Sequence, residues 1–117
     1  MIIAVNVSGA AVGGGLGRAA TMAVAIVDDG QVTSWQQFDV GWDVAHDQMD
    51  ATGSGHGGHH ATIVKFMREH QIEAVVAGHV GPPMVHTLGL MGIKVVTADG
   101  DAKQAAIAAV SAPGVVA

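Results

Sequence analysis

Short apolar runs, separated by glycine-rich or acidic turns, divide the first third of the chain into strand-like segments. An apolar run at 2–7 and a second one at 21–28, apolar on both faces, predict buried strands. The acidic turn at 28–30 joins the second run to a mixed stretch at 31–38, which is typical of an edge strand. We therefore expect these three strands to form an antiparallel meander.

The rest of the chain alternates helical and strand-like patterns. A connection at 39–58, rich in glycine, aspartate and histidine, comes first. Apolar residues at helical spacing around Ile63 and Met67 indicate a helix, and Asp101 can cap the last one. We expect a helix at 59–70, a strand at 73–77, a helix at 83–91, a strand at 93–98 and a helix at 102–110.

This order of segments predicts the fold class. Hairpins need only short turns, whereas parallel pairs need helical crossovers, which are right-handed. With strands numbered along the chain, we expect one domain over 1–117, an α/β protein with three layers (α/β/α). Its mixed five-stranded sheet would have the order 3-2-1-4-5 with strand 2 antiparallel. Loops 8–19, 39–60 and 78–83 would then share one rim, and the crevice between strands 1 and 4 is where such sheets bind ligands.

Composition narrows the classes of function. The chain has 117 residues, a formal net charge of −5 and only five Lys and Arg, which are scattered, so we expect no nucleic-acid partner. It has no cysteine, which excludes disulfides and metal sites held by thiolates. No apolar run reaches the roughly 20 residues that span a bilayer, and the N-terminus lacks a signal sequence, so we expect no membrane segment and a cytoplasmic protein.

The stretch GSGHGGHH at 53–60 holds three of the seven histidines and is the first candidate site. Neutral imidazole binds zinc, copper, nickel and iron, so His56, His59 and His60 are candidate metal ligands. His79 directly follows a predicted strand and would join them at the rim.

Helical spacing predicts where these imidazoles point. We expect His60 to face the sheet and His59 to lie at the edge of the apolar stripe. The two glycines before His59 disfavour a helix, which would leave His56 in the loop. The alternative is a solvated loop with incidental histidines, and for His79 a hydrogen-bonded structural role.

Glycines and one arginine add candidate contacts at the same rim. The glycine loop at 13–17 follows a strand but has neither dinucleotide-binding nor Walker spacing. Arg18 would balance the negative charge of a ligand, with a plain surface arginine as the alternative. Gly78 and Gly81 would let the backbone approach that ligand. Four residues of the long connection could add ligands or simply be solvated: Asp43, His46, Asp47 and Asp50.

Three stretches together resemble the dinitrogenase iron–molybdenum cofactor biosynthesis family, with its nitrogenase-accessory-factor-like domains. They are LGRA at 16–19, GHGGHH at 55–60 and AVVAGHVGPPMVHTLGLMGIKVV at 74–96. The resemblance implies a ribonuclease H-like fold and the binding, carriage or insertion of an iron–sulfur–molybdenum cofactor or its precursor. Because this chain has no cysteine, cluster binding would fall on histidine and backbone groups.

We therefore expect a small carrier for an iron–sulfur or iron–molybdenum cluster, its precursor, or a divalent Zn, Ni, Cu or Fe ion. A cofactor-assembly or recipient protein would be its partner. The alternatives are a metal-free sensor of an anion or small molecule, and a homodimeric interaction module joined at the strand that carries Trp35. We expect no enzyme, because no nucleophile or general-base pair can be named. A two-metal nuclease is also disfavoured, because the first strand carries Asn6 and no acid.

Overall fold

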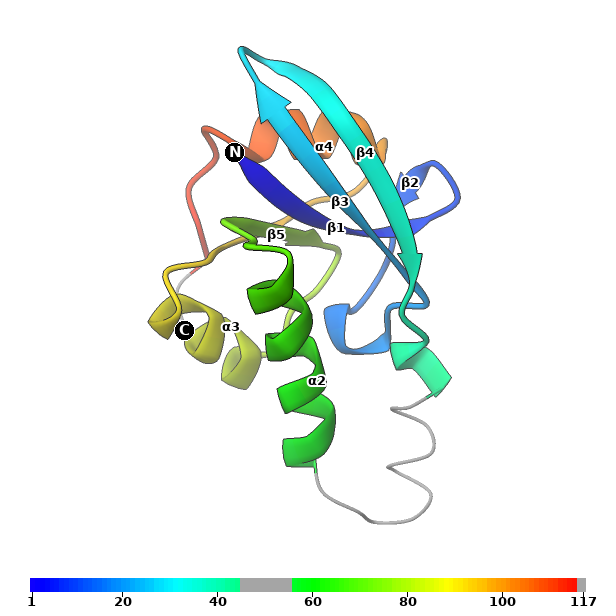
Figure 1. The fold of residues 1–117 in the computed structure, drawn as a ribbon, viewed down its shortest axis with the longest axis vertical. Helices are drawn as coiled ribbons and strands as arrows, with labels where there is room; N and C mark the ends of the chain where they lie inside the picture. The colour runs from blue at the N-terminus through cyan, green and yellow to red at the C-terminus, as the bar shows by residue number, and fades with distance from the viewer. Residues whose placement is uncertain (45–55, 116–117) are drawn as a thin grey trace.

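The computed structural model describes residues 1–44 and 56–115, with 56–58 described by their backbone alone. Figure 1 shows a sheet with α2 and α3 in front of it and α4 behind it. The elements are β1 (Ile2–Ser8), β2 (Ala11–Val12), the 3-10 helix η1 (Leu16–Arg18), β3 (Thr21–Asp28), β4 (Gln31–Asp39), α2 (His56–Glu69), β5 (Ala74–Ala77), α3 (Pro82–Leu90), β6 (Lys94–Thr97) and α4 (Ala102–Ala109).

The strands form one mixed sheet in the order β4-β3-β1-β5-β6, with β2 paired to β1. Strand β3 is antiparallel to both of its neighbours, and β5 is parallel to both β1 and β6. The α/β class and the order of the five longer strands agree with the sequence analysis. The strand count was wrong, because the short β2 folds back on the end of β1 through the pairs Val7↔Val12 and Ser8↔Ala11.

Side chains on the two faces of the sheet belong to two separate hydrophobic cores. In β1, Ala4 faces the core under α2 and α3, which also contains Ile63, Met67 and Leu88. Its neighbours Ile3 and Val5 face the core under α4, which is built largely from small alanines. This alternation is the ordinary consequence of the strand period of two, and it accounts for the three layers.

An aromatic cluster ties the end of β4 to α2. The ring of Phe66 contacts Phe38 edge-on with centroids 5.9 Å apart, and Trp42 edge-on at 5.4 Å. Its tilted contact with His70 has a centroid distance of 4.4 Å. Trp42 is buried, and its amide donates to the carbonyl of Ala19 at 2.9 Å. The residues after β4 are thereby attached both to η1 and to α2.

Local signals explain where the elements turn and stop. Asp29 and Gly30 both have positive φ, 51° and 74°, which matches the two-residue turn that suits a twisted hairpin. The carboxylate of Asp101 accepts from the amide of Gln104 at 2.9 Å, which confirms its predicted capping of α4. Among the described residues, no helix is long and apolar enough to cross a membrane.

The start of α2 differs from the expectation. The helix begins at His56, so the predicted connection through 58 was too long and the placement of His56 in a loop was wrong. The two glycines stand in the first turn. There the amide groups have no partner within the helix, so glycine costs less than it would in the middle.

Leu88 and Leu90 offer a matched test of this packing. Both lie in α3, but Leu88 is 0% exposed within the core and Leu90 is 77% exposed. We expect Leu88→Ala to lower the free energy of unfolding by about 2–5 kcal/mol in urea denaturation, because it leaves a cavity. Leu90→Ala should change it by less than about 0.5 kcal/mol. Equal effects of the two substitutions would contradict the placement of α3.

Candidate functional site

The glycine loop fills the crevice between the ends of β1 and β5. The amide of Gly78 donates to the carbonyls of Gly13 and Gly14, at 2.9 and 3.0 Å. The amide of Leu16 donates to the carbonyl of His79 at 2.9 Å. The expectation that this crevice itself would receive a ligand is therefore corrected. Protein backbone occupies it, and any ligand space lies beside it.

Asn6 anchors the same loop from inside the sheet. Its side chain is only 3% exposed, and its Nδ2 donates to the carbonyls of Gly14 and Gly15, both at 3.1 Å. The loop lies so close that a Cβ at Gly13 would come within 2.7 Å of the Asn6 Oδ1 atom. A Cβ at Gly78 would come within 2.7 Å of the Gly13 carbonyl oxygen. Gly78 thus packs against the backbone of the loop and Gly13 against the Asn6 carboxamide, and the expected approach of Gly78 to a ligand stays a prediction.

A cavity of about 360 Å³ lies beside this loop, between η1, the start of α2 and the start of α3. In Figure 1, α2 stands between η1 and α3. Apolar side chains form most of the walls, and two imidazoles supply the polar groups. The lining residues are Leu16, Gly17, His59, His60, Ile63, Val80, Gly81, Pro83 and Met84.

His59 joins α2 to the glycine loop. The residue is 8% exposed, and its Nε2 lies 2.7 Å from the Gly17 carbonyl oxygen, to which it donates. His60 was expected to face the sheet and His59 to lie at the edge of the apolar stripe, and this was wrong. The buried face of the helix centres on Ile63 and Met67 with Val64 only half-buried, which turns His59 inward.

His60 joins α2 to α3 on the other side. It is half-buried, and its Nε2 lies 3.1 Å from the Thr87 Oγ1 atom. Besides the cavity above, it lines a second, more open hollow of about 470 Å³ along the flank of α2, with Ala61, Val64, Lys65, Arg68 and Glu69. His60 is therefore the candidate imidazole that two solvent-connected spaces reach.

The other predicted ligands lie apart from this cavity or outside the described residues. The side chain of His79 is exposed, and the lining of the cavity does not include it. Arg18 is exposed at the end of η1 and does not line the cavity either. The side chain of His56 is not described. Three residues of the long connection lie outside the described part of the chain: His46, Asp47 and Asp50.

Metal binding by four histidines therefore stays a prediction. Among the side chains that the structure describes, which do not include that of His56, no three His, Asp or Glu form a group that could hold a metal ion. The donor chemistry of the cavity nevertheless fits. A metal-bound histidine usually donates its second ring N–H to a carbonyl or similar acceptor, and the Nε2 atoms of His59 and His60 both have such a neighbour.

Gly81 occupies the position that the sequence suggested, at the mouth of α3. It is the residue before the first turn, and it lines the cavity. A Cβ there would meet nothing closer than the Pro83 Cδ atom at 3.9 Å, so its lack of a side chain keeps the cavity open and is not forced by packing.

Two residues, Asn6 and Thr87, have contacts at the site that were not expected from the sequence. Asn6 carried a usable signal, because a carboxamide inside the apolar run at 2–7 needs hydrogen-bond partners once buried. Thr87 carried none, because threonine on a helix is ordinary and its partner lies 27 residues away in sequence.

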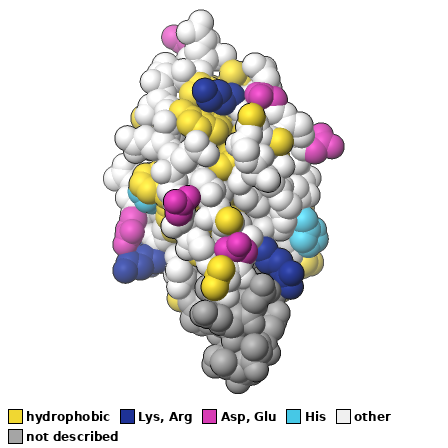
Figure 2. Space-filling model, turned by 90° about the vertical axis from the view of Figure 1, so that its right-hand side faces the viewer, with side chains coloured by type: hydrophobic (Ala, Val, Ile, Leu, Met, Phe, Trp, Pro, Cys, Tyr) yellow, Lys and Arg dark blue, Asp and Glu magenta, His cyan; other side chains and the backbone are white. Residues whose placement is uncertain are grey.

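Charged side chains of both signs are mixed on the face of the molecule drawn in Figure 2. In Figure 2, the Lys and Arg side chains stand apart from one another and alternate with Asp and Glu.

Comparisons with known proteins agree with the resemblance found in the sequence. The family model described as dinitrogenase iron-molybdenum cofactor matches residues 1–112. A comparison with curated proteins finds no match.

Several solved structures share the fold. The crystal structure of PH0822 has a TM-score of 0.68 at 17% identity, over 94% of this chain and 89% of that one. The apo form of the orange protein from Desulfovibrio gigas has a TM-score of 0.65 at 22% identity, over 92% and 83%. A candidate NifB protein from Thermotoga, placed in the DUF35 family, has a TM-score of 0.63 at 21% identity, over 94% and 86%. At these identities the likeness establishes the fold alone.

The close approach of Gly78 to the glycine loop can be tested with a single methyl group. We expect Gly78→Ala to lower the free energy of unfolding by about 1–3 kcal/mol, because the new Cβ would overlap the Gly13 carbonyl. The matched control is Gly14→Ala in the same loop, where a Cβ meets nothing within 4 Å. Its effect should stay under about 0.5 kcal/mol in the same denaturant titration. A neutral Gly78→Ala would disprove the contact.

The amide of Asn6 can be tested by an isosteric change. Asn6→Asp replaces the donor that faces the carbonyls of Gly14 and Gly15 with an acceptor, so we expect a loss of more than about 2 kcal/mol at neutral pH. Gln37→Glu makes the same chemical change at an exposed position of β4 and should be close to neutral. The free energy of unfolding of both variants can be measured by thermal or urea denaturation. An Asn6→Asp variant as stable as the parent would refute the hydrogen bonds from Asn6 to the glycine loop.

Proposed function

The chain belongs to the dinitrogenase iron-molybdenum cofactor family, and from this premise we propose that it is a small binding and carrier protein. Its cargo would be an iron–sulfur or iron–molybdenum cluster, a precursor of it, or a divalent metal ion. The family consists of accessory domains of the carrier type rather than of enzymes, in agreement with the sequence analysis. The observation that carries the proposal is the apolar cavity of about 360 Å³ lined by two adjacent histidines.

The cavity suits a cargo that has few hydrogen-bonding groups. Its walls include Leu16, Ile63, Val80 and Met84, which exclude water without competing for the ligand. His60 is the proposed protein ligand. His59 would hold the wall of η1 in place through Gly17, and its Nε2 is already engaged there.

Further predicted residues would act at the margin of this site. His56, the first residue of α2, and His79, which follows β5, would be further ligands for a cargo larger than a single ion. Arg18, at the end of η1, would offset negative charge on the cargo. A ribonuclease H-like description of the fold, a cytoplasmic location and a cofactor-assembly or recipient partner belong to the same proposal, and they rest on the family and the sequence.

The structural neighbours support a binding module. The orange protein of Desulfovibrio gigas was solved in an apo form, so a protein with this fold is stable without its bound group. The network of Asn6 and the glycine loop would keep the present chain folded in the same way when it carries no cargo.

A homodimer remains a second candidate because of one feature of the sheet. Strand β4 ends the sheet order, and within the described residues it pairs with β3 alone. An unpaired edge of nine residues can accept a second strand. Trp35 itself faces α4, where the Lys103 Nζ lies 5.6 Å from its ring centroid, so its replacement would not test the edge cleanly. The oligomeric state in solution tests it directly.

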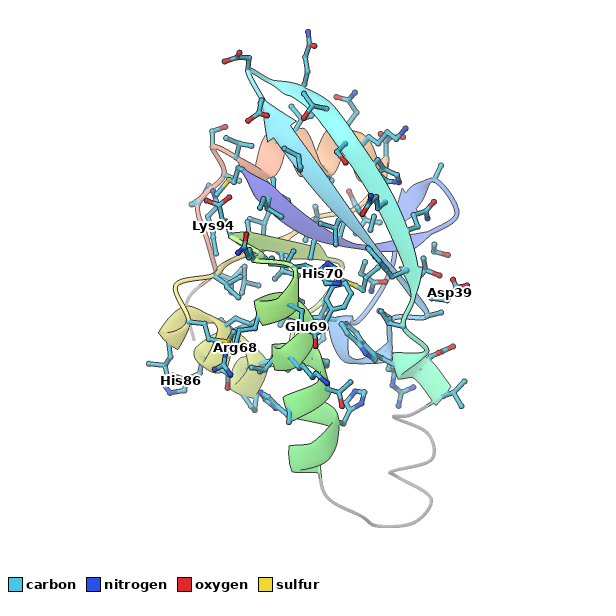
Figure 3. The ribbon with its side chains drawn as sticks, in the orientation of Figure 1. Asp39, Arg68, Glu69, His70, His86 and Lys94 are labelled. Atoms are coloured by element: carbon cyan, nitrogen blue, oxygen red, sulfur yellow. The ribbon has the colours of Figure 1, made fainter. Side chains whose placement is uncertain are left out.

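His60 and His86 make a matched pair for testing cargo binding. Figure 3 shows His86 on the outer side of α3, pointing away from α2, whereas His60 lines the cavity. We expect His60→Ala to weaken Zn²⁺ or Fe²⁺ binding by at least about tenfold in calorimetric titration, roughly 1.4 kcal/mol, and His86→Ala to leave it unchanged. The untagged protein should also retain metal on purification.

Two results would contradict the carrier proposal. One is the absence of metal from the purified protein together with no binding in titration. The other is equal affinity of the parent and His60→Ala proteins. Stabilisation of the parent by an anionic small molecule in the presence of a chelator would then favour the metal-free sensor.

A further inference from the structure

Thr87 has no expected role in a carrier, yet it stands between His60 and the first turn of α3. Its Oγ1 donates to the Pro83 carbonyl at 3.0 Å, and the same oxygen lies 3.1 Å from the His60 Nε2 atom. A threonine hydroxyl has one hydrogen and two lone pairs. Because the hydrogen is committed to Pro83, the oxygen can only accept a hydrogen bond from His60.

We propose that Thr87 is a positioning residue that fixes the tautomer of His60. A ring nitrogen that faces an acceptor must carry the hydrogen, so His60 holds its proton on Nε2. In the neutral imidazole the lone pair then lies on Nδ1. Thr87 thereby determines that Nδ1, and not Nε2, is the ring nitrogen of His60 with a lone pair to offer a cargo. The effect of this tautomer on metal binding rests on the proposed function. The tautomer itself can be measured in the protein without cargo.

The neighbouring histidine supplies an internal comparison. The Gly17 carbonyl can only accept, so the His59 Nε2 atom at 2.7 Å also carries a hydrogen. Two adjacent imidazoles are thus held in the same tautomer by unrelated partners, one a backbone carbonyl of η1 and the other a side chain of α3. A change at Thr87 should alter His60 and leave His59 as it is.

The Thr87–Pro83 bond also fixes where the hydroxyl points. Pro83 stands in the first turn of α3, and both Pro83 and His60 line the cavity. The two ends of the hydrogen-bonded series His60–Thr87–Pro83 therefore line the cavity, and Thr87 links them from outside its lining. Replacement of the hydroxyl by a methyl group removes the acceptor without changing the size or the branching of the side chain.

The test measures the tautomer of His60 by long-range ¹H–¹⁵N NMR of the apo protein at a pH where the imidazole is neutral. The parent should show the hydrogen of His60 on Nε2. Thr87→Val should populate both tautomers at His60 while His59 is unchanged, and Thr87→Ser should restore the parent spectrum. A parent protein with the hydrogen of His60 on Nδ1, or a His60 tautomer unaffected in Thr87→Val, would overturn the inference.

Zinc titration separates this inference from the proposed function. With Zn²⁺ as the probe, Thr87→Val should bind about 10–100-fold more weakly than the parent, as expected on loss of a partner that orients a metal-bound histidine, and Thr87→Ser should bind nearly normally. Equal zinc affinity of Thr87→Val and the parent would overturn the positioning role. If instead the parent binds neither Zn²⁺ nor Fe²⁺ and is purified without metal while the NMR result holds, the carrier proposal fails and the tautomer assignment stands. Unchanged circular dichroism spectra and melting temperatures within a few degrees show that the variants are folded.

Discussion

The packing of the glycine loop against the end of β5 is the contact that positions η1 and the cavity beside it. Two carbonyls of the loop share the amide of Gly78, and the carboxamide of Asn6 draws two carbonyls of the same loop toward the sheet. No side chain could stand at Gly13 or Gly78 without displacing these groups. The backbone therefore packs against backbone, at a place where most open α/β sheets leave a crevice for a ligand.

Because of this contact, the cavity lies beside the crevice between β1 and β5 and not within it. Once the loop fills the crevice, η1 faces the start of α2, and the cavity is enclosed by these two elements and by α3. His59 and His60 are consecutive residues of α2 that hydrogen-bond to two different elements. His59 contacts Gly17 of η1, and His60 contacts Thr87 of α3. The first turns of α2 are in this way attached on both flanks by imidazoles. The Gly17 carbonyl and the Thr87 hydroxyl, which hold these two imidazoles, are acceptors of the kind that would orient a metal-bound histidine.

Most of the fold could be predicted from the sequence, because its signals are local. The apolar runs, the turn at Asp29 and Gly30 and the cap at Asp101 each specify an element with little help from the remainder of the chain. The strand β2 escaped prediction, because two residues in a glycine-rich stretch show no period. The start of α2 was misjudged for a related reason, since glycine propensity is a weak guide where the amides have no partner within the helix.

The candidate site was predictable only in part. The sequence singled out the histidines at 59–60, and the structure places both at the wall of one cavity. It could not give the rotation of α2, because the inward turn of His59 depends on the way Ile63 and Met67 pack under the sheet. It also could not give the partner of His60, because the contact with Thr87 is a product of tertiary packing alone. The roles of individual imidazoles thus follow from the neighbours of α2 and not from their spacing along the chain.

The attachment of Trp42 has a practical consequence. Its indole lies edge-on to Phe66 of α2, and its amide is bound to the carbonyl that directly follows η1. The chain has one other tryptophan, Trp35, which lies on the opposite side of the sheet over α4. A small separation of η1 from α2 would therefore alter the surroundings of one indole and spare the other. Intrinsic fluorescence can report on the walls of the cavity without any added label.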